Sequence, residues 1–241
     1  MKLAVISDIH ANLEALEAIM RDIELQQADK IVCLGDTIGY GADPIPCLEA
    51  VETRCETRLM GNHEYAVLGK LPSQQINRTA KIALNWTQNQ LQDNVMSRIA
   101  DLPMTAAMGD LFFVHASPWE PTRWRYVLSP GEAEAAFKNF DQRICFNGHS
   151  HLPMIFALAD NQIRVKTGHG FQPNEDTRYI VNVGSVGQPR DNDPRACYVV
   201  FDTAEDEVIY RRVDYDIAKA QHKMRQAELP AMLIQRLQSG M

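Results

Sequence analysis

Histidine, aspartate and asparagine side chains gather in five short polar segments of the chain, each placed after an apolar run. In chain order they are Asp8, His10, Asp36, Asn62, His63, His115, His149 and His151. Five of the seven histidines belong to this set. Imidazole and carboxylate ligands without thiolates suit Mn, Fe, Zn, Co or Ni better than Ca or Mg, which prefer oxygen ligands. The residue types therefore predict a transition-metal site.

The number of candidate ligands favours two ions over one. A single ion takes about four to six ligands, and seven candidates exceed one such shell even when His63 is set aside. Asp36 has two carboxylate oxygens, so it can bridge two ions about 3.5–4 Å apart. Two dications facing the carboxylates of Asp8 and Asp36 leave about two positive charges, which attract an anion.

A pair of divalent ions suits the hydrolysis of a phosphate ester. The ions hold phosphate oxygens and lower the pKa of a shared water from about 15.7 to about 7, so that a bridging hydroxide is the nucleophile. The leaving alkoxide needs a proton, and His63, next to Asn62, is the candidate general acid. Glu64 is expected to orient the His63 ring.

Predicted strands place these residues together. The apolar runs 2–6, 30–34 and 58–60 each end at one of the polar segments, and the carboxyl ends of strands in an open α/β sheet line one edge. Further strands are predicted at 111–114, 143–146, 154–159, 163–166, 178–183, 196–202 and 207–213. Helices are predicted over 12–27 with Asn12 as N-cap, over 44–52, twice within 74–101, and over 216–237 with an interruption at Pro230.

Size, charge and composition restrict the classes of function. The 241 residues, 45% of them hydrophobic, fit one domain over residues 1–241. A formal net charge of -7 argues against general binding to nucleic acid. Neither a signal peptide nor a run of roughly 18 apolar residues for a membrane helix is found in the sequence, and the five cysteines form no C-x-x-C pair. We expect a soluble, cytoplasmic protein with reduced thiols, and leave its oligomeric state open.

Five motifs resemble those of the calcineurin-like metallophosphoesterases, in the same order. They are Ser7-Asp8-Ile9-His10, Gly35-Asp36-x-x-Gly39, Gly61-Asn62-His63-Glu64, His115 after a strand, and Gly148-His149-Ser150-His151. The stretch 182–190 is also similar to that of the bacterial phosphodiesterase-like branch. The resemblance implies an α/β fold, a four-layer α/β/β/α sandwich of two mixed sheets flanked by helices.

The same resemblance implies a role for each site residue. One divalent ion would be held by Asp8, His10, Asp36 and His151, and the second by Asp36, Asn62, His115 and His149. His63 would lie over the site beside the scissile bond.

Four further residues are candidates for contact with the substrate. Trp119 and Arg123 lie in an aromatic and basic segment after His115, where such side chains stack a nucleobase and bind a second phosphate or pack the loop. Tyr40 and Arg190 contact substrate or make structural hydrogen bonds. Phosphodiesters or dinucleoside polyphosphates are the expected small substrates. The alternatives are a phosphomonoesterase or protein phosphatase of the same family, and a non-catalytic metal-binding scaffold, against which the presence of His63 argues.

Overall fold

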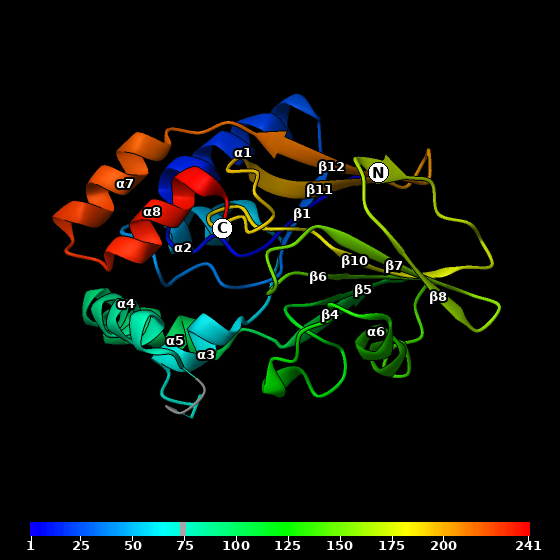
Figure 1. Cartoon of the computed structure of the whole chain (residues 1–241), viewed down its shortest axis with the longest axis horizontal. Helices are drawn as coiled ribbons and strands as arrows, with labels where there is room; N and C mark the ends of the chain where they lie inside the picture. The colour runs from blue at the N-terminus through cyan, green and yellow to red at the C-terminus, as the bar shows by residue number, and fades with distance from the viewer. Residues whose placement is uncertain (73–75) are drawn as a thin grey trace.

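Two six-stranded mixed sheets lie face to face in the middle of the molecule (Figure 1). The computed structural model describes residues 1–72 and 76–241. The first sheet runs, in spatial order, β3 (Thr57–Arg58), β2 (Lys30–Cys33), β1 (Lys2–Ile6), β11 (Ala196–Asp202), β12 (Glu207–Val213) and β9 (Gly170–Phe171). The second runs β4 (Thr105–Met108), β5 (Leu111–Val114), β6 (Ile144–Asn147), β10 (Arg178–Asn182), β7 (Met154–Ala159) and β8 (Gln162–Lys166).

The main core lies between the two sheets. Alternate residues of the strands point inward, so Leu3 and Val5 of β1 join Phe113 of β5 and Phe146 of β6 in one buried cluster. The rings of Phe146 and Phe201 meet across the two sheets, with centroids 6.1 Å apart. Burial of this apolar surface holds the two sheets together.

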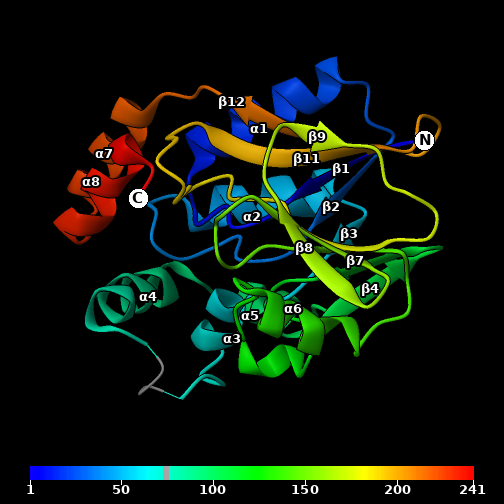
Figure 2. The same cartoon turned by 45° about the vertical axis from the view of Figure 1, so that its right-hand side comes forward.

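Helices cover the outer faces of both sheets (Figure 2). On the first sheet, α1 (Leu13–Leu25) and α2 (Pro44–Arg54) pack against the outward-facing residues of β1, β2 and β11. On the second, α6 (Pro130–Phe137) packs against β6, β7 and β10. The four-layer α/β/β/α sandwich expected from the sequence is therefore confirmed.

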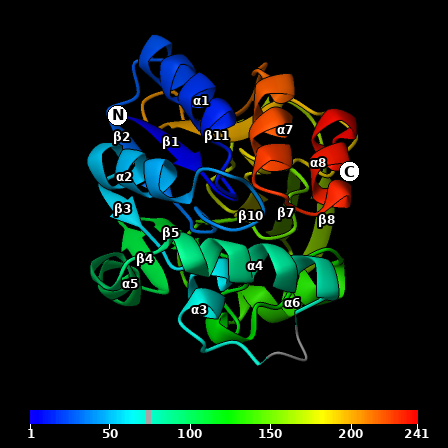
Figure 3. The same ribbon diagram turned by 90° about the vertical axis from the view of Figure 1, so that its left-hand side faces the viewer.

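In the part of the chain that the structure describes, five further α-helices lie around the ends of the sheets (Figure 3). They are α3 (Asn62–Val67), α4 (Arg78–Gln90), α5 (Asp93–Ala100), α7 (Ile217–Gln226) and α8 (Ala231–Ser239). Lys223 of α7 binds Glu14 of α1 at 2.7 Å, which ties the C-terminal helices to the first sheet's covering layer. Within the described residues, no helix is long and apolar enough to span a bilayer.

The structure corrects several of the sequence-based elements, and one of its additions is the two-residue strand β9. Asn62 and His63, expected in a turn, begin α3. Strand β4 was not predicted, because Thr105–Met108 is only four residues long and, apart from Thr105, lacks the β-branched and aromatic residues typical of strands. Helix α6 was also missed, although its capping signal is present: Ser129 accepts from the Glu132 N–H and its hydroxyl donates to the Glu132 carboxylate.

Candidate metal centre

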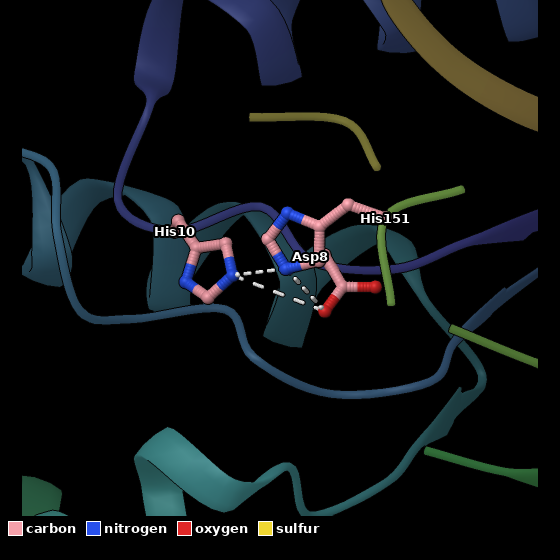
Figure 4. A group of neighbouring side chains, drawn as sticks. All are labelled: Asp8, His10 and His151. Carbon is pink, nitrogen blue, oxygen red and sulfur yellow. Dashed lines mark hydrogen bonds and ion pairs between the residues drawn. The ribbon is translucent and has the colours of Figure 1, made fainter. Parts of the chain in front are cut away.

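Two histidines and an aspartate converge at the ends of β1 and β6. Asp8 and His10 follow β1, and His151 follows β6. The Nε2 atoms of His10 and His151 lie 3.1 Å apart, and Asp8 Oδ1 lies 3.3 Å from His151 Nε2 and 3.8 Å from His10 Nε2 (Figure 4). All three side chains are buried. Two ring nitrogens and a carboxylate oxygen thus face a common point.

A second group lies beside the first. Asp36 follows β2, His115 follows β5, and His149 follows β6. Each offers one potential ligand atom, and these three atoms all lie within 4.8 Å of one another. His115 Nε2 is 3.4 Å from Asp36 Oδ2 and 3.1 Å from Asn62 Oδ1. Asp36 Oδ2 also lies 3.7 Å from His10 Nε2, in the first group. Asp36 is therefore placed between the two groups.

Backbone carbonyl groups fix the orientation of three of the rings. The Nδ1 atoms of His10, His115 and His151 lie 3.3, 3.2 and 2.6 Å from the carbonyl oxygens of Ile38, Leu34 and Gln188. A carbonyl oxygen only accepts, so each Nδ1 carries a proton and each Nε2 faces the centre, where it offers a lone pair in the neutral ring. This tautomer is the one that binds a cation through Nε2.

The backbone at the centre is held in an uncommon conformation. Five of the seven expected ligand residues have a positive φ, between 51° and 66°: Asp8, His10, Asp36, His149 and His151. This left-handed region is sparsely populated by residues other than glycine and costs of the order of 1 kcal/mol or more at each position. The packed sheets on either side maintain these turns, and the turns aim the side chains toward one another.

The carboxylate of Glu64 holds one of these turns against the start of α3. It accepts from the N–H groups of Asp36 at 2.8 Å, Thr37 at 2.8 Å, Ile38 at 3.2 Å and Gly61 at 2.9 Å. Its expected partner was the His63 ring, and that expectation is wrong, because the carboxylate is occupied by backbone donors. Glu64 instead joins the turn that carries Asp36 to the start of α3.

The electrostatics of the centre favour a bound positive charge. Burial alone would raise the pKa values of Asp8 and Asp36, but nearby histidines, His151 for Asp8 and His115 for Asp36, hold both values below the ordinary range. Burial lowers the pKa of His149 to about 3, so this ring is neutral. Burial would do the same to His115, but the charge of Asp36 outweighs it and raises the pKa of His115 to about 9.

These observations fit a divalent cation. Asp8 Oδ1 is buried and has no hydrogen-bond donor, which is costly for an anionic oxygen. The two Nε2 lone pairs at 3.1 Å also oppose each other unless a positive charge lies between them. The proton on His115 balances part of the carboxylate charge, and a cation would take its place. The described residues thus form His and Asp groups suited to metal binding.

His63 lies at the edge of the centre and is not part of its carbonyl-oriented set. Its Nε2 is 4.0 Å from Asp36 Oδ2, and its ring packs edge-on to Tyr40 with centroids 4.4 Å apart. The buried Nδ1 has no hydrogen-bond partner. A Cβ atom on Gly39, whose φ is +88°, would overlap this Nδ1, so glycine is required there.

A cavity of about 190 Å³ opens beside the centre. Its polar and aromatic lining comprises Tyr40, Asn62, His63, Asn77, Arg123, Trp124, Tyr126 and His149. Tyr126 stacks on His149 with centroids 4.3 Å apart. The remaining lining is apolar and comprises Ala66 of α3, Leu71, Ile76, and Ala80 and Leu84 of α4. The cavity can accept a flat or apolar group next to the metal ligands.

Two of the four residues predicted from the sequence to contact substrate line this cavity, and two do not. Tyr40 and Arg123 line it. Trp119 and Arg190 are outside its lining; Trp119 lies under the Arg125 guanidinium at 4.0 Å, so its ring packs within its own loop. Trp124 and Tyr126, neighbours in the same segment, take the place in the lining that was expected of Trp119.

Comparison with known proteins agrees with this geometry. A family model described as the calcineurin-like phosphoesterase superfamily domain matches residues 1–206. The chain belongs to the calcineurin-like phosphoesterase superfamily. An uncharacterized protein of Methanocaldococcus jannaschii, MJ0912, is 38% identical over 242 residues, covering 99% of this chain and 98% of that protein.

Two solved structures share the fold over the whole chain. A metallophosphoesterase from Sphaerobacter thermophilus is 37% identical with a TM-score of 0.87, covering 100% of this chain and 99% of the other. The hypothetical protein PH1004 from Pyrococcus horikoshii has a TM-score of 0.81 at 20% identity, covering 100% and 98%. Membership of the superfamily supports a phosphoesterase, a hydrolase of phosphate esters.

Proposed function

We propose that the chain is a dimetal phosphoesterase that hydrolyses phosphodiesters or dinucleoside polyphosphates. The observation that carries the proposal is the position of Asp36, whose Oδ2 lies 3.4 Å from His115 Nε2 and 3.7 Å from His10 Nε2, between two ligand groups. Similarity to a metallophosphoesterase over the whole chain supports it. The buried, unpaired state of all five cysteines supports a reducing compartment, the cytoplasm.

Two ligand sets are proposed, with Asp36 in both. Asp8, His10, Asp36 and His151 would hold one ion, and Asp36, Asn62, His115 and His149 the other. When bound, a pair of divalent cations neutralises charge on phosphate oxygens and lowers the pKa of the attacking water. Mn, Fe, Zn, Co and Ni are all compatible with histidine and carboxylate ligands.

His63 is the proposed general acid for the leaving group. Burial lowers its pKa, with Asp36 acting in the opposite direction, so the ring is neutral before substrate binds. An anionic phosphate ester arriving beside the ring adds negative charge, which raises the pKa of the imidazole and lets it carry a proton. The ring can then donate that proton to the departing alkoxide.

The cavity supports an ester with a bulky group over a small monoester. Tyr126 stacks on His149 and Trp124 packs edge-on to His115, and Arg123 adds a positive charge at the same opening. Aromatic faces stack nucleobases, and a guanidinium pairs with phosphate. A nucleoside esterified to the reacting phosphate would fill this volume.

Hydrolysis of bis-p-nitrophenyl phosphate with added Mn²⁺ tests the proposed function. His63→Ala should lower kcat about 100-fold or more with its metal content unchanged, and Asp36→Asn should lose both metal and activity. His222→Ala, on the exposed side of α7, is the matched control and should keep the wild-type rate. A wild-type rate no higher than that of Asp36→Asn would overturn the proposal in favour of a non-catalytic scaffold.

The preference among esters is tested with the same preparation. We expect kcat/KM for bis-p-nitrophenyl phosphate and for diadenosine tetraphosphate to exceed that for p-nitrophenyl phosphate. A higher value for the monoester would contradict the preference and assign the chain to the phosphomonoesterases.

A further inference from the structure

Two arginines meet beside the metal centre on a single neutral oxygen. Arg190 Nη2 donates to Gln188 Oε1 at 2.9 Å, and Arg236 Nη1 donates to the same atom at 3.1 Å. The Nε atom of each arginine is buried and has no hydrogen-bond partner. Among the described residues, neither guanidinium is in an ion pair with a carboxylate, whereas Arg211 and Arg212 each pair with an aspartate.

Gln188 connects this arginine pair to the metal centre. Its backbone oxygen accepts from His151 Nδ1 at 2.6 Å, and the N–H of Arg190 donates to the carbonyl of His151 at 3.3 Å. The side chain of Gln188 is buried. One residue therefore orients a proposed metal ligand with its backbone and gathers two guanidinium groups with its amide.

The second arginine comes from the C-terminal helix. Helix α8, red in Figure 1, ends against the segment that follows β10, where Asn192 N–H donates to the Gly240 carbonyl at 2.8 Å. The family model matches residues 1–206, so α8 lies beyond the matched region. Arg236 is thus brought to the centre by a part of the chain that the family motifs do not include.

The pair is electrostatically unbalanced. Burial lowers the pKa of the Arg236 guanidinium, and the like charge of Arg190 lowers it further. One amide oxygen satisfies one N–H of each group and neutralises neither charge. Fixed guanidinium groups with unused donors bind oxyanions such as phosphate through charge-assisted, often bidentate hydrogen bonds.

We propose that Arg190 and Arg236 form a subsite for a second phosphate group of the substrate. The occupant's identity as substrate rests on the proposed function, since the metal centre would hold the phosphate that reacts. The substrate class is then an ester with at least one further phosphate, such as a nucleoside or dinucleoside polyphosphate. Tyr40, whose hydroxyl interacts with Arg190, also lines the cavity of Trp124 and Tyr126, which would take the nucleoside.

Binding of pyrophosphate to the full chain, stripped of metal and dialysed, tests the subsite without catalysis. Isothermal titration calorimetry should show pyrophosphate binding to wild type and at least about 10-fold weaker binding to Arg236→Gln. Arg225→Gln, on an exposed position of α7, removes the same charge and should bind like wild type. Equal affinity of Arg236→Gln and wild type, or no binding to wild type, would overturn the proposal.

Two further arms separate the alternatives. Malonate is a dicarboxylate of comparable size. If wild type binds malonate as tightly as pyrophosphate or more tightly, the assignment of the subsite to phosphate is overturned.

In the Mn²⁺-loaded protein, Arg236→Gln should raise KM for diadenosine tetraphosphate at least about 10-fold with kcat little changed. An unchanged KM would contradict the subsite. Unfolding midpoints of both variants within a few degrees of wild type verify the fold. If no ester is hydrolysed, the proposed function fails while the calorimetric result stands.

Discussion

Substitution of Glu64 by glutamine separates the stability of the fold from the function of its metal centre. The Glu64 carboxylate is fully buried and accepts four backbone N–H groups, from Asp36, Thr37, Ile38 and Gly61. Glutamine has nearly the same shape, but its NH₂ group cannot accept. In either amide orientation, two of the four N–H groups lose their acceptor.

The opposing effect is the cost of burying the charge. Burial, followed by the charge of Asp36, raises the pKa of Glu64 from 4.5 to about 7 even with its backbone donors in place. An acid with a raised folded-state pKa binds more protons when folded, so metal-free wild type loses stability as pH rises from about 4.5 to about 7. At roughly 1.4 kcal/mol per pKa unit, the loss is about 3 kcal/mol. Glutamine does not titrate, so the Glu64→Gln variant does not lose this stability as pH rises.

We therefore expect Glu64→Gln to stabilise the metal-free chain and to weaken the centre. Urea denaturation of metal-free protein should give similar unfolding free energies near pH 4.5, with the variant about 3 kcal/mol more stable at pH 8. The loosened Asp36 turn should lower metal affinity or activity about 10- to 100-fold, as for other groups that orient metal ligands. A wild type more stable than the variant at pH 8 would refute this reasoning, because the four N–H groups would then outweigh burial.

Three other substitutions or titrations have definite expected outcomes. Gly39→Ala places a Cβ on His63 Nδ1 at a φ of +88°, so kcat should fall toward that of His63→Ala; full activity would contradict this placement. Because Asp36 outweighs burial and raises the pKa of His115 to about 9, metal binding at pH 7.5 should release about one proton, measured by calorimetry in buffers of different ionisation enthalpy. A binding enthalpy that does not change with the buffer would show that no proton is released and would contradict the raised pKa of His115. Asn12→Ala removes the helix cap on Ala15 N–H and should lower the unfolding free energy by about 1 kcal/mol; an unchanged urea midpoint would exclude that role.

The convergence of the predicted metal ligands could be predicted from the sequence, because it depends only on which residues follow neighbouring parallel strands. Asp8 and Asp36 follow adjacent parallel strands, β1 and β2, and residues at the carboxyl ends of such strands share an edge. His115 and His149 follow the parallel pair β5 and β6 of the second sheet. The order and the chemical types of these residues were therefore sufficient to bring them together. Their pairing into two metal sites remains a prediction, as does the extent of the domain over residues 1–241.

Features that depend on tertiary geometry were not accessible in this way. The left-handed φ of His149 and His151 could not be predicted from the sequence, because histidine is enriched in this region but only a few per cent of non-glycine residues adopt it. The direction of Glu64 was misassigned, because adjacency in sequence favoured His63 and gave no sign of the backbone donors 26 to 28 residues away. Arg236 carries no motif, and only the docking of α8 brings it to Gln188.

Anomalous diffraction from crystals grown with Mn²⁺ is the decisive test of a two-ion centre. We predict two manganese peaks about 3.5–4 Å apart, one among Asp8, His10 and His151 and the other among Asn62, His115 and His149, with Asp36 coordinating both. Crystals without a peak between these side chains, or with manganese bound only elsewhere on the surface, would contradict it.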